Sequence, residues 1–135
     1  MMPQSTQQVI IDSDFFLEAD SFCVVSARRV GTPELHRLLC HDDKEITVIT
    51  TEAALADVDI IARNKEQWRL FVINCANPFY CVGFLSAIAA AMTQAGLDIL
   101  LTSTFSRDLV FVPQADVDTA TKVLVQLGFK PRQRC

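Results

Sequence analysis

The sequence predicts an α+β fold of the ferredoxin-like βαββαβ plan, in which antiparallel sheets carry helices on one face. The strand-like segments are short and rich in β-branched and aromatic residues. Two segments in the second half repeat apolar residues at helical spacing, and a two-residue reversal joins two strands between them. This order of strand, helix, strand, strand and helix is typical of an antiparallel sheet whose helices share one side.

The clearest elements lie in the second half of the chain. Residues 68–75 (WRLFVINC) are rich in β-formers and predict a strand. Asn77 and Pro78 then interrupt the chain, and we expect Asn77 to cap a helix that has Pro78 in its first turn. Apolar side chains recur at helical spacing over residues 84–95, and the glycine that follows predicts the end of the helix.

A hairpin and a second helix follow in the sequence. Residues 97–105 (LDILLTSTF) alternate apolar and polar side chains, which predicts a half-buried strand. Residues 106–107 leave room only for a tight reversal before a returning strand at residues 109–112. Residues 117–127 repeat apolar side chains at helical spacing, and a short last strand is expected near Phe129.

The first half of the chain repeats this order more loosely. We expect strands at residues 22–26, 45–51 and 58–62, a short helix at 33–40 and a helical turn at 53–56. The polar run Asn64-Lys65-Glu66 is the expected boundary. The sequence therefore predicts two subdomains of the same plan, residues 1–66 and 67–135, whose sheets either exchange strands or join side by side.

Composition limits the kinds of partner. The net charge of −4 argues against nucleic acid, and charged residues interrupt every apolar run, which argues against a membrane partner. The mean hydropathy of +0.27 is high for small subdomains and predicts a homodimer or a larger assembly. The polar start lacks the pattern of a signal peptide, and the cysteines lack CxxC spacing, so we expect a reducing, cytoplasmic location.

The motifs of catalysis and cofactor binding are missing from the sequence, which has no phosphate loop, dinucleotide fingerprint, nucleophile elbow or HExxH pair. We therefore predict no enzyme activity and no cofactor. His36, Cys40 and His41 come nearest to a metal site, but no second pair of ligands follows at a recognised spacing, so no metal is predicted. Cys81 is the best-placed candidate for a nucleophile, although no histidine lies near it in the sequence.

The segment from Asn77 to Leu85 and the strand end at residues 103–105 form the candidate binding site. Gly83 removes a side chain near a helix start, so a ligand could approach the backbone and place a carboxylate against first-turn N–H groups. The hydroxyl groups of the strand end would lie beside it. The residues alone leave an alternative open, in which Gly83 permits a close strand–helix crossing and the Ser-Thr pair merely ends a strand.

Residues 83–120 resemble the ACT domains of the CASTOR-type amino-acid sensors, of their bacterial relatives and of aspartate kinase regulatory domains. The resemblance lies in a glycine-containing helix start, the turn AGLDI, the triplet STF, an acidic residue after it and a helix start of the form VPxxD. It implies a tandem pair of βαββαβ units that bind a free amino acid at an ACT–ACT interface. Such a module regulates a protein partner and has no catalysis of its own.

The resemblance also implies a ligand site, which comprises Cys81, Val82, Gly83, Phe84, Leu85, Ser103, Thr104, Phe105 and Asp108. Amides at the helix start would hold the α-carboxylate, and Asp108 with backbone carbonyls would hold the α-amino group. Ser106 and Arg107 depart from the usual STFDTD pattern, which leaves the identity of the ligand open. The alternative function is a ligand-free structural or protein-interaction module with the same fold.

Overall fold

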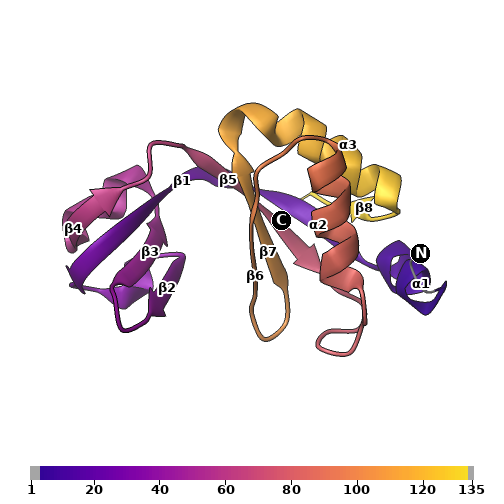
Figure 1. The fold of residues 1–135 in the computed structure, drawn as a ribbon, viewed down its shortest axis with the longest axis horizontal. Coiled ribbons are helices and arrows are strands. Elements are labelled where there is room, and N and C mark those ends of the chain that lie inside the picture. Colours follow the sequence, from indigo (N-terminus) through magenta and orange to yellow (C-terminus); the bar gives the residue numbers. More distant parts are fainter. Residues whose placement is uncertain (1–3, 134–135) are drawn as a thin grey trace. The chain divides into compact units, whose positions relative to one another are not determined.

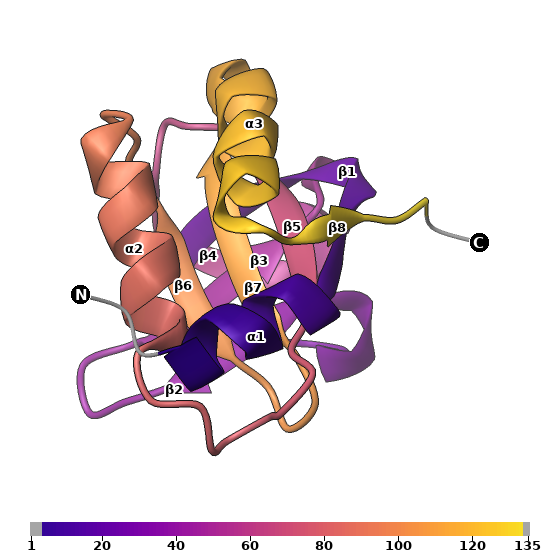
Figure 2. The same cartoon turned by 90° about the vertical axis from the view of Figure 1, so that its right-hand side faces the viewer.

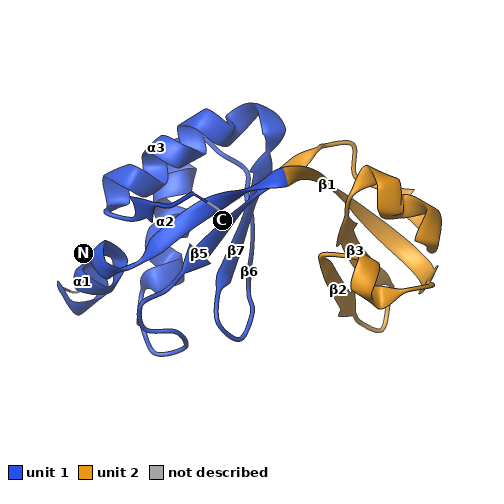
Figure 3. Ribbon diagram, turned by 180° about the vertical axis from the view of Figure 1, so that it is seen from behind, with its two compact units in different colours: residues 1–19, 69–135 blue, residues 20–68 orange. Residues whose placement is uncertain are grey.

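The computed structural model describes residues 4–133, which form two compact units (Figure 3). Unit 1 lies within residues 1–19 and 69–135, and unit 2 comprises residues 20–68. The elements shown in Figure 1 are α1 (Gln4–Asp12), β1 (Asp14–Val30), β2 (Leu38–His41), β3 (Ile46–Thr50), β4 (Val58–Arg63), β5 (Trp68–Asn74), α2 (Phe84–Gln94), β6 (Leu100–Ser103), β7 (Asp108–Pro113), α3 (Val117–Leu127) and β8 (Lys130–Pro131). Three short 3-10 segments, η1 (Pro33–Leu35), η2 (Glu52–Asp57) and η3 (Gln114–Asp116), join them.

The sheet of unit 1 has the strand order β8-β1-β5-β7-β6, in which only the first part of β1 takes part. β6 and β7 form an antiparallel hairpin in which Ser103 lies opposite Asp108. β8 runs parallel to β1 and pairs Lys130 with Asp14. From β5 to β8 the element order is βαββαβ, so the predicted α+β, ferredoxin-like fold is confirmed.

The helices α2 and α3 cover one face of this sheet (Figure 2). Residues at helical spacing point into the core from α2 (Phe84, Ile88 and Met92) and from α3 (Ala120, Val123 and Leu124). They meet alternate residues of the strands, namely Phe15, Phe71, Ile73, Val110 and Val112. The helical faces and the stops at the following glycines are therefore confirmed, because Gly96 and Gly128 adopt left-handed backbone conformations there.

The helix α1 was missed by the sequence analysis. Its nine residues are mostly polar, and only Thr6 and Ile10 are buried. Ile10 is fully buried in the core of unit 1. One apolar anchor in a polar segment gives no helical periodicity, so tertiary contacts rather than the local pattern hold this helix in place. Within residues 4–133, none of the helices has the length and apolar character of a membrane span.

Unit 2 is a small antiparallel sheet with the strand order β2-β3-β1-β4. Its core contains Val25, Ala27, Val48 and Val58. The predicted strands at 45–51 and 58–62 correspond to β3 and β4, and the predicted turn at 53–56 lies in η2. Residues 20–68, all of which the structure describes, contain no α-helix.

The prediction of a helix at residues 33–40 is wrong. A 3-10 turn ends at Leu35, and the chain then pairs with β3 as strand β2. The cause is His36, whose fully buried side chain bonds Thr50 Oγ1 through Nδ1 and Asp57 Oδ2 through Nε2, both at 2.8 Å. These contacts draw the segment to the edge of β3 and break the helical arrangement that would have put His36 and Cys40 on one face.

Strand β1 is much longer than the expected strand at 22–26. Its 17 residues serve unit 1 at one end and unit 2 at the other. The compact units therefore do not follow a single cut at residues 64–66, since residues before Asp20 join the second half of the chain in unit 1. That the two halves, 1–66 and 67–135, are each ACT-like stays a prediction.

Asp57 should give unit 2 an acid-sensitive component of stability. Its pKa lies below the ordinary value of 3.8 because the amide of Thr32 donates to the carboxylate, with His36 as the second cause. The contribution is therefore present above the unfolded pKa and is lost as the pH falls through the lower folded pKa. Thermal melts of Asp57→Asn should differ from wild type most at roughly pH 6 and converge toward roughly pH 2. The exposed Asp43→Asn is the control, and a difference that does not vary with pH contradicts this account.

Candidate functional site

A pocket of about 260 Å³ lies in unit 1 between the loop after β5, the start of α2 and the β6–β7 hairpin. Its lining contains part of the predicted ligand site: Cys81, Phe84, Leu85, Ser103 and Asp108. It also contains Cys75, Asn77 and Phe79 from the loop. Residues from two segments about 20 positions apart in sequence thus meet at one cavity.

Gly83 begins α2. It adopts a left-handed backbone conformation, with φ of +85°, and its carbonyl accepts the first helical hydrogen bond from the amide of Ala87. A residue with a side chain is strained at this φ, which explains a glycine there. Asn77 is not the helix cap, so that prediction is wrong. Its side chain instead donates to the carbonyl of Tyr80 at 3.1 Å and holds the loop.

The first turn of α2 leaves backbone amides without acceptors. Phe84 N donates to Cys81 O at 3.2 Å, which removes it from the set available to a ligand. The amides of Leu85 and Ser86 have no acceptor among residues 4–133. Free amides at a helix N-terminus, where the helix dipole is positive, attract a carboxylate.

Asp108 provides the negative charge of the pocket. Its residue is only 9% exposed, and Ser103 Oγ donates to its Oδ1 at 2.5 Å across the hairpin. No cationic side chain of the described chain pairs with Asp108. A cation that enters the pocket would therefore gain a charge-assisted contact with this carboxylate.

The other predicted site residues lie beside the pocket but do not line it. Val82 and Phe105 are 84% and 82% exposed. Thr104 closes the hairpin turn, because its amide and its hydroxyl both contact Arg107 O, at 2.8 and 3.2 Å. A tight reversal between the two strands is confirmed, but it spans residues 104–107 and not 106–107 alone. The strand before it runs from Leu100 to Ser103, which is shorter than the expected 97–105.

The loop between β5 and α2 is held at both ends by α1 and the residue after it. Thr6 Oγ1 donates to Val82 O at 2.5 Å near the end of the loop. At its start, the amide of Ala76 donates to Ser13 Oγ at 2.9 Å, and Ser13 Oγ donates to Val9 O. Thr6 and Ser13 are nearly fully buried. Sequence reasoning missed both residues, because nothing in the polar first segment links it to a loop 70 positions away.

Cys75 and Cys81 both line the pocket. Burial raises the pKa of the Cys75 thiol above its ordinary value. A hydrogen bond from the backbone of Asn77 partly offsets this effect, and the nearby Asp108 and Cys81 add to it. Both histidines, His36 and His41, belong to unit 2. In the described part of the chain, no group of three or more histidine, cysteine or carboxylate side chains is arranged to hold a metal ion.

Residues 64–126 match the ACT domain family model. The match to the ACT domain runs from the residues before β5 into α3, so it includes the pocket. No curated protein sequence matches the chain.

Solved structures share the fold at low sequence identity. A protein of unknown function from Vibrio cholerae, described as a possible transport protein, has a TM-score of 0.76 at 14% identity, with 93% of this chain and 97% of that one covered. A protein from Agobacterium tumefaciens has a TM-score of 0.71 at 15% identity, covering 91% and 94%. The regulatory subunit of aspartate kinase from Thermus thermophilus, in its ligand-free form, has a TM-score of 0.59 at 11% identity, covering 84% and 95%. These likenesses, together with the ACT domain match, support the ferredoxin-like fold; the resemblance to CASTOR-type sensors stays a prediction.

The bond from Thr6 to Val82 should hold the loop. Thr6→Val keeps the shape of the buried side chain but removes the donor, so it should lower the free energy of unfolding by about 1 kcal/mol. It should also speed amide hydrogen exchange over residues 76–83, whereas Thr6→Ser should behave like wild type. Equal exchange rates in the valine and serine variants would show that the bond does not restrain the loop.

Thiol labelling should separate Cys75 from Cys40. A raised pKa lowers the thiolate fraction at neutral pH, so Cys75 should react with a maleimide more slowly than the exposed Cys40. Peptide mapping by mass spectrometry after timed labelling measures both rates. Labelling of Cys75 as fast as that of Cys40 contradicts the burial argument and favours a cysteine-dependent activity.

Proposed function

We propose that this protein is a regulatory module that binds a free amino acid in the pocket of unit 1 and carries out no catalysis. The observation that carries the proposal is Asp108, a mostly buried carboxylate without a cationic partner, in a pocket that is also lined by the start of α2. An α-amino acid is a zwitterion, so its ammonium and carboxylate need opposite charges close together. Asp108 supplies the negative charge for the ammonium, and the positive end of α2 supplies a partner for the carboxylate.

The two ends of the ligand have separate partners. The ammonium group pairs with Asp108, whose Oδ1 is oriented by the hydroxyl of Ser103. The carboxylate takes hydrogen bonds from the amides of Leu85 and Ser86 at the positive end of α2. Of the helix-start amides expected to hold the carboxylate, those of residues 82–85, Phe84 N already donates to Cys81 O. The proposal therefore uses Leu85 N and adds Ser86 N, which was not predicted.

The wider assembly is part of the proposal. We infer a tandem of ACT-like subdomains, 1–66 and 67–135, that forms a homodimer or larger, places the ligand at an ACT–ACT interface and regulates a protein partner. The ACT domain match and the structural likeness to an aspartate kinase regulatory subunit support it. A reducing, cytoplasmic location is consistent with the free thiols of Cys23, Cys40, Cys75 and Cys81.

A ligand-free interaction module is the second candidate. It is favoured by the exposed rings of Phe79, Tyr80 and Phe105, which a protein partner could cover. The two candidates differ in one simple measurement. A screen of thermal stability against the twenty amino acids should raise the melting temperature for at least one of them if the pocket binds a ligand.

The role of Asp108 should appear in the affinity. Asp108→Asn keeps an acceptor for Ser103 but removes the charge, so it should weaken binding of the amino acid found in the screen by about 1.5–3 kcal/mol, or roughly ten- to a hundredfold. Asp98→Asn, which changes an exposed carboxylate outside the pocket, is the matched control. Isothermal titration calorimetry measures both. Binding of no amino acid at millimolar concentration, or equal affinity in both variants, would refute the proposed site.

A further inference from the structure

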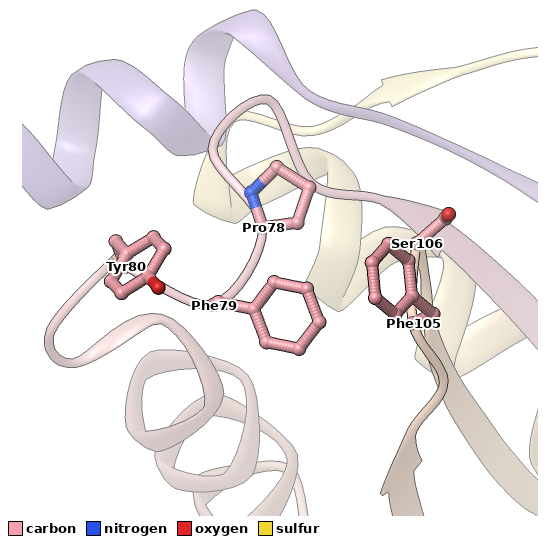
Figure 4. Close-up of a pocket in the computed structure, with 5 residues that line it drawn as sticks. All are labelled: Pro78, Phe79, Tyr80, Phe105 and Ser106. Carbon is pink, nitrogen blue, oxygen red and sulfur yellow. The ribbon is translucent and has the colours of Figure 1, made fainter.

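An aromatic groove adjoins the pocket of Asp108. It has a volume of about 610 Å³ and is lined by Pro78, Phe79, Tyr80, Phe105 and Ser106 (Figure 4). We define these residues as the aromatic groove. Its rings are 67%, 81% and 82% exposed for Phe79, Tyr80 and Phe105, so a large apolar area remains in contact with water.

Contacts between the rings and a hydrogen bond in the loop order the groove. Phe79 lies between the other two rings, with centroids 5.1 Å from Phe105 in an edge-to-face arrangement and 6.2 Å from Tyr80 (Figure 4). Phe79 has a φ of +70°, and it is the one residue other than glycine with a positive φ in the described part of the chain. This conformation is unfavourable for a bulky residue, and strained backbones of this kind cluster at functional sites. The bond from Asn77 to Tyr80 O restrains the loop on either side of Phe79.

Phe79 connects the groove to the charged pocket. It lines the aromatic groove and also the pocket that contains Asp108 and Ser103. A ligand whose ammonium group pairs with Asp108 can therefore extend its side chain along Phe79 toward Phe105. The lining of the groove has no charged side chain, so a lysine or arginine side chain would lose hydration there without gaining a carboxylate partner.

We propose that the ligand is an amino acid with a large apolar side chain, and that Phe79 and Phe105 select it. This inference rests on the proposed function, because it uses Asp108 as the anchor of the amino group. Each methylene removed from water contributes about 0.8 kcal/mol, or about fourfold in affinity. An open groove removes only part of the ligand side chain from water, so only part of this free energy is gained. Phenylalanine or leucine should therefore bind at least roughly tenfold more tightly than alanine.

The test compares ligands across variants by calorimetry. Titrations of wild type with phenylalanine, leucine, alanine and lysine should rank the two large apolar amino acids first. Phe105→Ala should reduce the preference for phenylalanine over alanine to about threefold or less. Phe105→Leu should keep most of the preference. Val125→Ala, which removes an exposed apolar side chain from α3, is the control and should leave the ratio as in wild type.

The outcomes separate this inference from the function on which it rests. Tighter binding of lysine or alanine than of phenylalanine by wild type would overturn the selectivity and leave the amino-acid site intact. So would an unchanged ratio in Phe105→Ala. If that variant instead changes the oligomeric state in light scattering without changing the ratio, the rings form an interface between copies, and the inference is wrong. Binding of no amino acid at all would reject both proposals together.

Discussion

Burial of the apolar faces of α2 and α3 against one face of a sheet holds unit 1 together and fixes its functional geometry. Ile88, Met92 and Leu124 are fully buried there, against strands β5 and β7. Phe84, in the first turn of α2, belongs to the same core as Val110 and Val112 of β7, which links the start of the helix to the β6–β7 hairpin. Since the free amides belong to the helix and Asp108 belongs to the hairpin, the core itself fixes the helix start and the carboxylate relative to each other.

The loop between β5 and α2 has fewer constraints, and its order comes from polar contacts. Thr6 and Ser13 hold its ends, and Asn77 spans its tip. A loop with few buried apolar contacts opens more readily than the helix that follows. The candidate pocket therefore combines a helix start that is fixed by the core with a loop that is held by polar contacts. Phe79 lies on that loop and lines the groove.

The sequence predicted the fold well wherever one local signal decided the structure. The helices after Gly83 and after Asp116 follow apolar periodicity that ends at a glycine. It failed where distant side chains decided. His36 turns the predicted helix at 33–40 into strand β2 through Thr50 and Asp57. The helix α1 depends on the core of unit 1, and Ile10 is the one residue of this helix that is fully buried there.

The candidate site was predictable in part for the same reason. Gly83 and Ser103 stand at element ends, which the sequence marks by residue type, and Asp108 follows from the resemblance. The place of Phe79 in the lining of the pocket could not be predicted, because a phenylalanine does not signal the positive φ that it adopts here.

The long strand β1 also affects how the protein folds during its synthesis. On the ribosome, all residues of unit 2 emerge before α3 and β8, so unit 2 can form while α1 and Phe15 still lack most of their core. For that interval the nascent chain exposes apolar side chains, and chaperone binding to the nascent protein should centre on this first segment.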